Sequence, residues 1–94
     1  MTHVVRRNDA DGRYELEVDG ELVGVADFVL RDEAVLMPHT EVQADRRGNG
    51  MGDLLVRGAL DDIRAAGRTV IPACWFVADY LDHHPEYADL RAAS

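Results

Sequence analysis

Apolar and polar residues alternate near the start of the chain in the manner of a strand that is buried on one face. Within residues 14–18, three apolar residues are separated by two glutamates, and this spacing of two places the apolar side chains together. Asp19-Gly20 follows directly and is typical of a tight hairpin turn. The pattern therefore predicts an antiparallel hairpin whose second strand covers residues 22–30.

Extended segments are also predicted on both sides of this hairpin. Residues 3–7 form a short candidate strand, which the turn-rich residues 8–12 separate from the hairpin. After a turn at residues 31–33, a third strand or long extended segment is expected from residue 34 to about 43. Pro38 lies inside it and lacks the N–H of a ladder donor, so we expect a bulge or an edge position there.

A helical period replaces the alternation in the second half. Between residues 50 and 66, apolar residues recur every three or four positions, and Gly67 is a suitable C-terminal cap. Residues 69–74 are typical of a buried strand, and a helix before it makes a parallel crossover natural. A second helix is predicted over residues 75–84, where Pro85 stops it. Trp75, Phe76 and Tyr80 are expected in the core.

Four antiparallel strands followed by helix, strand and helix predict an α+β (mixed α/β) fold built on one twisted sheet. The chain has 94 residues, of which 47% are hydrophobic. This length suits a single domain covering residues 1–94, and this composition argues against disorder.

The charge of the chain and its cysteine content indicate which partners it can bind and in which cellular compartment it works. The net charge is -8 and the pI about 4.7, so nucleic acid and anionic membranes are poor partners. No run of eighteen apolar residues and no signal-like N-terminus is present, and the single Cys74 excludes an intrachain disulfide. We therefore expect a cytoplasmic protein.

His83 and His84 are adjacent on a predicted helix and point apart, so no metal site is expected.

The segment with the clearest chemistry is the loop between the extended segment and the first helix. Its sequence is Arg46-Arg47-Gly48-Asn49-Gly50-Met51-Gly52. Three alternate glycines let the backbone approach a ligand, and the following helix directs its free amides and positive dipole end to the same place. An ordinary glycine-rich turn needs only one or two glycines. The loop therefore indicates a phosphate or pyrophosphate site; Arg46 could instead be a solvated surface charge.

This loop resembles the pyrophosphate loop of the GCN5-related N-acetyltransferases. Residues 38–42, 71–74 and 84–87 resemble stretches of the small single-domain members, so that the resemblance covers residues 38–90. It implies a minimal form of that fold: a mostly antiparallel sheet with two splayed parallel strands and two main helices. It also implies acetyl-CoA as cofactor, bound by Arg46, Arg47, Gly48, Asn49, Gly50, Met51 and Gly52, with backbone groups of Glu41 and Val42 on the pantetheine arm.

The chain departs from the larger members of this family in one respect. They carry two helices between their first two strands, whereas only residues 8–12 separate those strands here, and their C-terminal strands are missing. The acceptor pocket must then be shallow or completed by another molecule. The sequence leaves open both the acceptor, a small amine or a protein amine, and the oligomeric state.

The resemblance implies transfer of an acetyl group by direct attack of the amine on the thioester. His39 is the candidate base, because histidine titrates near neutrality. Strand alternation places it on the same face as Glu41, about 6.5–7 Å away, so that a water could link them but a direct bond is not expected. Alternatively, His39 is a partly buried residue that anchors the turn after Pro38.

Cys74 is the second candidate catalytic residue. It ends a predicted parallel strand and begins a helix, a position that favours a thiolate and therefore a covalent acetyl-cysteine route. The alternative is a small buried hydrophobe. For the whole chain, the main alternative function is a non-catalytic CoA- or acyl-CoA-binding or protein-interaction module. A nucleotide-binding loop is not supported, because the Gly-Lys-Ser/Thr ending is missing.

Overall fold

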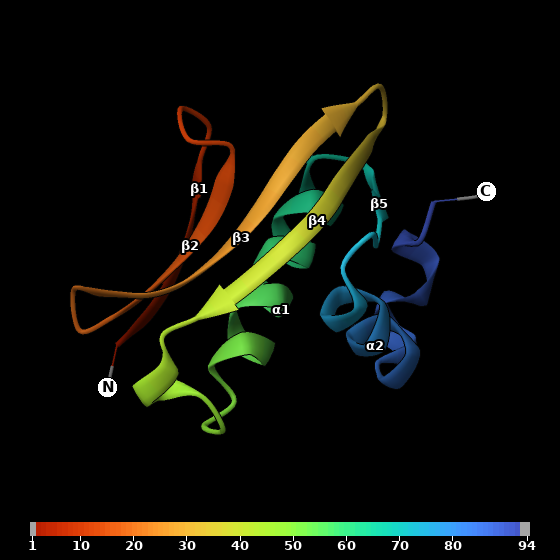
Figure 1. Ribbon diagram of the computed structural model, residues 1–94. Coiled ribbons are helices and arrows are strands. Elements are labelled where there is room, and N and C mark those ends of the chain that lie inside the picture. The colour runs from red at the N-terminus through yellow and green to blue at the C-terminus, as the bar shows by residue number, and fades with distance from the viewer. Residues whose placement is uncertain (1, 93–94) are drawn as a thin grey trace.

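One twisted sheet of five strands forms the body of the molecule, and its longest helix lies across one face (Figure 1). The computed structural model describes residues 2–92. Helix α1 contacts all five strands, so the core lies between this helix and the sheet. In chain order the elements are β1 (His3–Asn8), β2 (Arg13–Val18), β3 (Glu21–Arg31), β4 (Ala34–Val42), the 3₁₀ helix η1 (Ala44–Arg46), α1 (Met51–Ala65), β5 (Thr69–Ile71), α2 (Trp75–His83) and the 3₁₀ helix η2 (Pro85–Leu90).

The strands follow their chain order across the sheet. Neighbours from β1 to β4 are antiparallel, and β5 alone is parallel, next to β4. The predicted α+β fold with a mostly antiparallel sheet and two main helices is confirmed. The hairpin turn is also confirmed, since Asp19 and Gly20 both have positive φ (52° and 86°), the backbone twist that suits antiparallel neighbours.

Strands β4 and β5 diverge soon after they meet. They pair only from Ala34 opposite Thr69 to Leu36 opposite Ile71. The prediction of a strand through residue 74 is wrong for its last three residues. Pro72 cannot donate to a ladder, and the next amide, of Ala73, turns back to the carbonyl of Ile71. The chain therefore leaves the sheet while β4 continues, and this opens a gap between the two parallel strands.

A bulge in β4 lies at the expected position. Leu36 is opposite Val29 and His39 is opposite Asp27, so two residues of β4, Met37 and Pro38, face a single residue of β3. The extra residue increases the local twist. Pro38 therefore marks the point beyond which β4 bends away from β5.

Core packing follows the predicted faces for the strands but not for all aromatic residues. Tyr14, Tyr80 and the apolar stripe of α1 are buried, whereas Trp75 is 76% exposed. Helix α2 turns its buried residues Val77 and Leu81 toward the core. Position 75 lies two residues before Val77, about 200° around the helix, and therefore faces outward. The prediction that Trp75 belongs to the core is wrong.

The two edges of the sheet are different. The short β5 is covered on its outer side, because Arg91 forms a parallel bridge with Val70 and the amide of Ala92 donates to the carbonyl of Val70 at 2.8 Å. Strand β1 has no neighbour on its outer side among residues 2–92. Over the same residues, the helices are too short and too polar to cross a bilayer.

Candidate functional site

Beside the last residues of β4, beyond the point where β5 leaves the sheet, the structure contains a cavity of about 680 Å³. Its three walls come from different elements. Residues 39–42 of β4 form one wall, Arg47 and the glycine-rich turn into α1 form the second, and Trp75 and Phe76 at the start of α2 form the third. The divergence of the parallel strands thus brings the predicted loop and the end of β4 to one place.

The loop has the open backbone that its glycines predicted. Gly48 and Gly50 have φ of 84° and 75°, which glycine adopts without strain, and a Cβ added at either would meet nothing within 4 Å. The first helical bond of α1 runs from the amide of Leu54 to the carbonyl of Gly50. The amides of the first turn therefore have no partner in a preceding turn and remain available to an anion.

Gly52 has a different structural role. It lies inside α1, and a Cβ there would stand only 2.6 Å from Cζ of Phe76. The absent side chain lets the ring of Phe76 pack against the first turn of α1. Two of the three alternate glycines thus shape the loop, and the third positions the aromatic wall of the cavity.

The two arginines of the loop point to different partners. Arg47 lines the cavity, where its Nε donates to the carbonyl of Val42 at 3.1 Å and ties the loop to the end of β4. Arg46 lies outside the lining and forms an ion pair with Glu21 at 2.6 Å. Asn49 is exposed at the tip of the loop and also lies outside the lining. Arg47 is therefore the arginine placed to meet a ligand in the cavity.

His39 and Glu41 lie on one face of β4 at the cavity. Both side chains are exposed, and Nε2 of His39 is 3.6 Å from Oε2 of Glu41. This separation is longer than a hydrogen bond, so the expectation that no direct hydrogen bond joins them is confirmed. It is within the range of an ion pair with a protonated histidine and is too short for a bridging water, so the expected water link is not supported. The structure does not support a partly buried anchoring role, because more than half of the imidazole is accessible.

Cys74 approaches a different residue of β4. Its Sγ is 3.8 Å from Oγ1 of Thr40, and its amide donates to the carbonyl of Met37. Thr40 is opposite the buried Ala26, whereas His39 is opposite Asp27. Since successive strand residues face opposite sides, the imidazole and the thiol lie on different sides of β4. The two candidate mechanisms would therefore use different sides of the strand.

Four residues of the cavity were missed by sequence reasoning. Thr40, Asp53, Trp75 and Phe76 all line it. Thr40 and Asp53 are immediate neighbours of predicted site residues, so adjacency could have indicated them. Phe76 is placed by its contact with Gly52, a long-range contact that no local pattern contains.

Tyr80, His83 and His84 are not among the residues that line this cavity. Tyr80 is buried, which raises its pKa to about 12, and its ring stacks on His84 at 3.7 Å. Nδ1 of His83 lies 2.8 Å from the carbonyl of Asp79. Over residues 2–92, no group of three His, Cys, Asp or Glu side chains converges as metal ligands would.

Comparison with known proteins covers most of the chain. The family model described as GCN5-related N-acetyl-transferase matches residues 13–90. None of the proteins with curated functions matches the sequence. Among solved structures, a GCN5-like putative N-acetyltransferase from Staphylococcus aureus has a TM-score of 0.72 at 16% identity, over 97% of this chain and 89% of that protein.

Larger enzymes share part of the same architecture. The ribosomal-protein-S18-alanine N-acetyltransferase of Escherichia coli has a TM-score of 0.58 at 17% identity, over 62% of this chain but only 38% of that enzyme. The N-acetylglutamate synthase of Neisseria gonorrhoeae, solved with coenzyme A and N-acetyl-glutamate, has a TM-score of 0.56 at 19% identity over 72% of this chain and 18% of that enzyme. At these identities the similarity shows a shared fold.

Proposed function

Because the chain belongs to the GCN5-related N-acetyltransferases, whose family model matches residues 13–90, we propose that it transfers an acetyl group from acetyl-CoA to an amine. The observation that carries the proposal is the cavity between the diverging strands, with an open glycine turn at one end and β4 along its side. A neighbour with the same fold is complexed with coenzyme A. We also propose that residues 1–94 form one domain and that the protein works in the reducing cytoplasm, where a free Cys74 is stable.

The pyrophosphate is the best-supported part of the proposed ligand. The first-turn amides of α1 and the dipole of this helix favour negative charge at Gly50. Arg47 is fixed by its bond to Val42 and adds a guanidinium on the same side of the cavity. Met51 and Asn49 are proposed to contribute only backbone groups, and Arg46 a more distant charge.

The pantetheine arm is proposed to lie along β4 in the gap that β5 leaves. Main-chain groups of Glu41 and Val42 would bond it in place of a strand, and the aromatic wall of Trp75 and Phe76 would cover it. A backbone amide directed at the thioester carbonyl would stabilise the negative charge that develops on oxygen during attack. Cofactor binding would then depend on the backbone of β4 more than on its side chains.

In the proposed reaction, the amine nitrogen attacks the thioester carbon directly. The new C–N bond forms as the C–S bond breaks, and coenzyme A leaves as a thiolate. The attacking nitrogen must lose a proton, and His39 is exposed at the cavity and can accept it, directly or through a water. The net charge of -8 favours a cationic acceptor such as a polyamine or an exposed lysine.

A second candidate function is a CoA-binding or protein-interaction module without catalysis. It is favoured by the connection between β1 and β2, which is a short turn rather than a helical segment that could form an acceptor pocket. The chain also spans only 38% of the E. coli enzyme. On this alternative, acetyl-CoA binds but no amine is acetylated.

Thermal unfolding with and without acetyl-CoA tests the binding step. For a dissociation constant one hundredth of the ligand concentration, the expected gain is about 2.7 kcal/mol, which raises the Tm by roughly 10 °C or more. Gly50→Asn tolerates the left-handed backbone but fills the approach to the loop, so its shift should be lost. Gly20→Asn is the matched control, since Gly20 also has positive φ with open space around it and lies in a distant hairpin.

An unchanged wild-type Tm at millimolar acetyl-CoA would overturn the proposal. Release of the CoA thiol is then followed with a panel of polyamines and lysine peptides. Turnover above the hydrolysis background supports the transferase. A stabilising shift without turnover on any amine would favour the binding module.

A further inference from the structure

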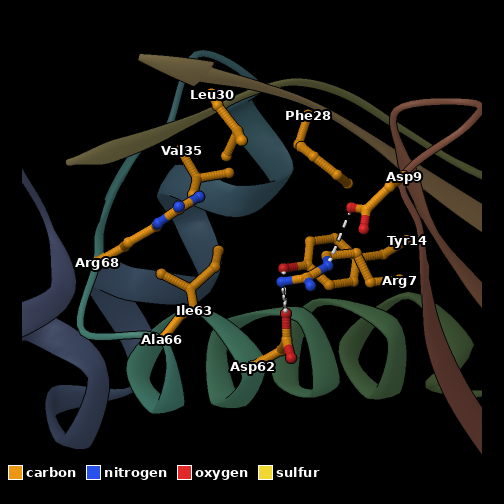
Figure 2. Close-up of a pocket in the computed structure, with 10 residues that line it drawn as sticks. All are labelled: Arg7, Asp9, Tyr14, Phe28, Leu30, Val35, Asp62, Ile63, Ala66 and Arg68. Carbon is orange, nitrogen blue, oxygen red and sulfur yellow. Dashed lines mark hydrogen bonds and ion pairs between the residues drawn. The ribbon is translucent and has the colours of Figure 1, made fainter. Parts of the chain in front are cut away.

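A second cavity lies at the other end of α1, between this helix and the hairpin ends of the sheet (Figure 2). Its volume is about 460 Å³, within the range of small-molecule sites. Asp62, which lines it, comes eleven residues after Met51 of the first cavity, a rise of about 16 Å along the helix. The two cavities share no lining residue, so this one does not belong to the proposed acetyl-CoA site.

The second cavity has an apolar floor. Phe28 and Val35 come from the sheet, and Ile63 comes from α1 (Figure 2). Leu30 lies at the rim with 52% of its surface exposed, although it is a large apolar residue next to an apolar surface. An apolar group bound here would remove part of the Leu30 side chain from water, which favours binding.

One side of the cavity is closed by a complete polar network. Oδ2 of Asp62 accepts from the hydroxyl of Tyr14 at 2.8 Å and from NH1 of Arg7 at 3.2 Å. Nε of Arg7 also pairs with Asp9 at 3.0 Å. Arg7 is thus shared between two carboxylates, and burial together with Asp62 raises the pKa of Tyr14, which remains a neutral donor. These four residues pair with one another and form one wall of the cavity.

Arg68 stands on the opposite side and is different from Arg7. Its guanidinium extends over the cavity near Val35 (Figure 2). Within the described part of the chain it takes part in no ion pair, although acidic residues outnumber arginines 18 to 10. The amide of Arg68 donates to the carbonyl of Ile63, which holds its backbone at the cavity. One cation therefore faces an apolar floor without a partner.

We infer that this cavity binds a small monocarboxylic acid with an aromatic or branched apolar body. The carboxylate takes two donors from Arg68, and the apolar body covers Phe28, Val35 and Leu30. The lining contains two arginines and two aspartates, and Arg7 is already paired with both aspartates, so Arg68 is the cation that remains for an anion. A single carboxylate pairs with Arg68 and meets less repulsion from Asp9 and Asp62 than a doubly charged phosphate would.

The test is a titration of ¹⁵N-labelled protein with phenylacetate, followed by amide chemical shifts. Shifts are expected around Arg68 and along the second half of α1, with a dissociation constant of about 1 mM or below. Phenylacetamide has the same shape without the charge and should bind at least tenfold more weakly. Arg68→Gln should weaken phenylacetate by the same factor, whereas Arg31→Gln, which removes an arginine outside the cavity, should not.

A second variant separates loss of binding from loss of folding. Leu30→Glu changes an exposed residue and places a like charge at the rim, so it should leave the Tm nearly unchanged and abolish binding. Both cavity variants should keep the wild-type response to acetyl-CoA, which separates this inference from the proposed transferase. Equal binding of phenylacetamide, equal binding by Arg68→Gln, or shifts confined to the first cavity would each overturn the inference.

Discussion

Gly52 and Phe76 are in direct contact where α1 and α2 approach one another, with no room for a Cβ on the glycine. This contact joins the end of the glycine-rich loop to the aromatic wall of the first cavity. A substitution at Gly52 therefore acts on two features together, the packing of the helices and the shape of the proposed ligand site. A second close approach, of Gly58 to Val5, fixes β1 against α1 in the same way.

Replacement of Gly52 or Gly58 in α1 by alanine should lower the stability of the fold, although helix propensity alone predicts the opposite. Alanine is favoured over glycine in a helix by about 1 kcal/mol, yet both Gly52→Ala and Gly58→Ala should destabilise the fold. At Gly52 the obstacle is the far end of a ring, which can swing away. At Gly58 it is Cβ of Val5 at 2.6 Å, fixed to the backbone. We expect losses of roughly 1 and 2 kcal/mol respectively in urea unfolding.

Phe76→Leu provides the control for the first of these losses. In the double variant with Gly52→Ala the smaller side chain leaves space for the new methyl group, so the two changes should cost less together than their sum. Additive losses, or a gain in stability for either alanine variant alone, would contradict the proposed packing role of these glycines.

Trp75 should report ligand binding in the first cavity. It is the only tryptophan of the chain, it lines the cavity and it is 76% exposed. Acetyl-CoA lying along β4 would cover the indole, so the fluorescence emission should shift to shorter wavelength and saturate with ligand. Arg47→Ala should weaken this response at least tenfold by removing a charged contact to the pyrophosphate. If the emission spectrum of Trp75 does not change at saturating acetyl-CoA, the cofactor binds at another place on the protein.

His39 and Cys74 should separate the two proposed mechanisms. In direct transfer, His39→Ala lowers turnover by about 10²–10⁴ with little change in acetyl-CoA affinity, because a general base acts mainly in the transition state. Cys74→Ser should keep most of the activity and lose only some packing. Mass analysis after incubation with acetyl-CoA alone provides the check, and a stoichiometric acetyl group on Cys74 that passes to amine would establish the covalent route instead.

Alkaline unfolding is expected from the tyrosines. Burial raises the pKa of Tyr14, Tyr80 and Tyr87, that of Tyr80 to about 12. Between pH 10 and 12 the unfolded chain therefore binds fewer protons than the fold, and the free energy of unfolding falls as the pH rises. Absorbance at 295 nm should show little tyrosinate at pH 10 in the folded protein, whereas about half ionises in urea. A folded spectrum that matches the urea spectrum would contradict this.

Local patterns predicted the parts of the fold that depend on local chemistry. Alternation located β2, Asp19-Gly20 gave the hairpin turn, and Pro38 marked the bulge, because each depends on the residue itself and its near neighbours. The loop conformation at Gly48 and Gly50 follows for the same reason. The sequence thus predicted the sheet and the backbone of the candidate site.

Features that depend on distant contacts were not predictable in this way. The pairing of Arg46 with Glu21 joins the end of η1 to the first residue of β3. The early end of β5 is an exception, because Pro72 is a local signal for it. The exposure of Trp75 depends on which face α2 turns to α1. No local pattern records such relations, which arise only when the helices dock on the sheet.

The covered outer side of β5 has a consequence for the protein at high concentration. With Arg91 and Ala92 occupying that edge, β1 is the edge that residues 2–92 leave open to another chain. Arg6 and Arg7 lie on β1 and are each paired within the molecule, Arg6 with Glu17 and Arg7 with Asp9 and Asp62. A strand that added at β1 would have to pack beside these ion-paired side chains, and charged residues on an edge strand disfavour edge-to-edge pairing.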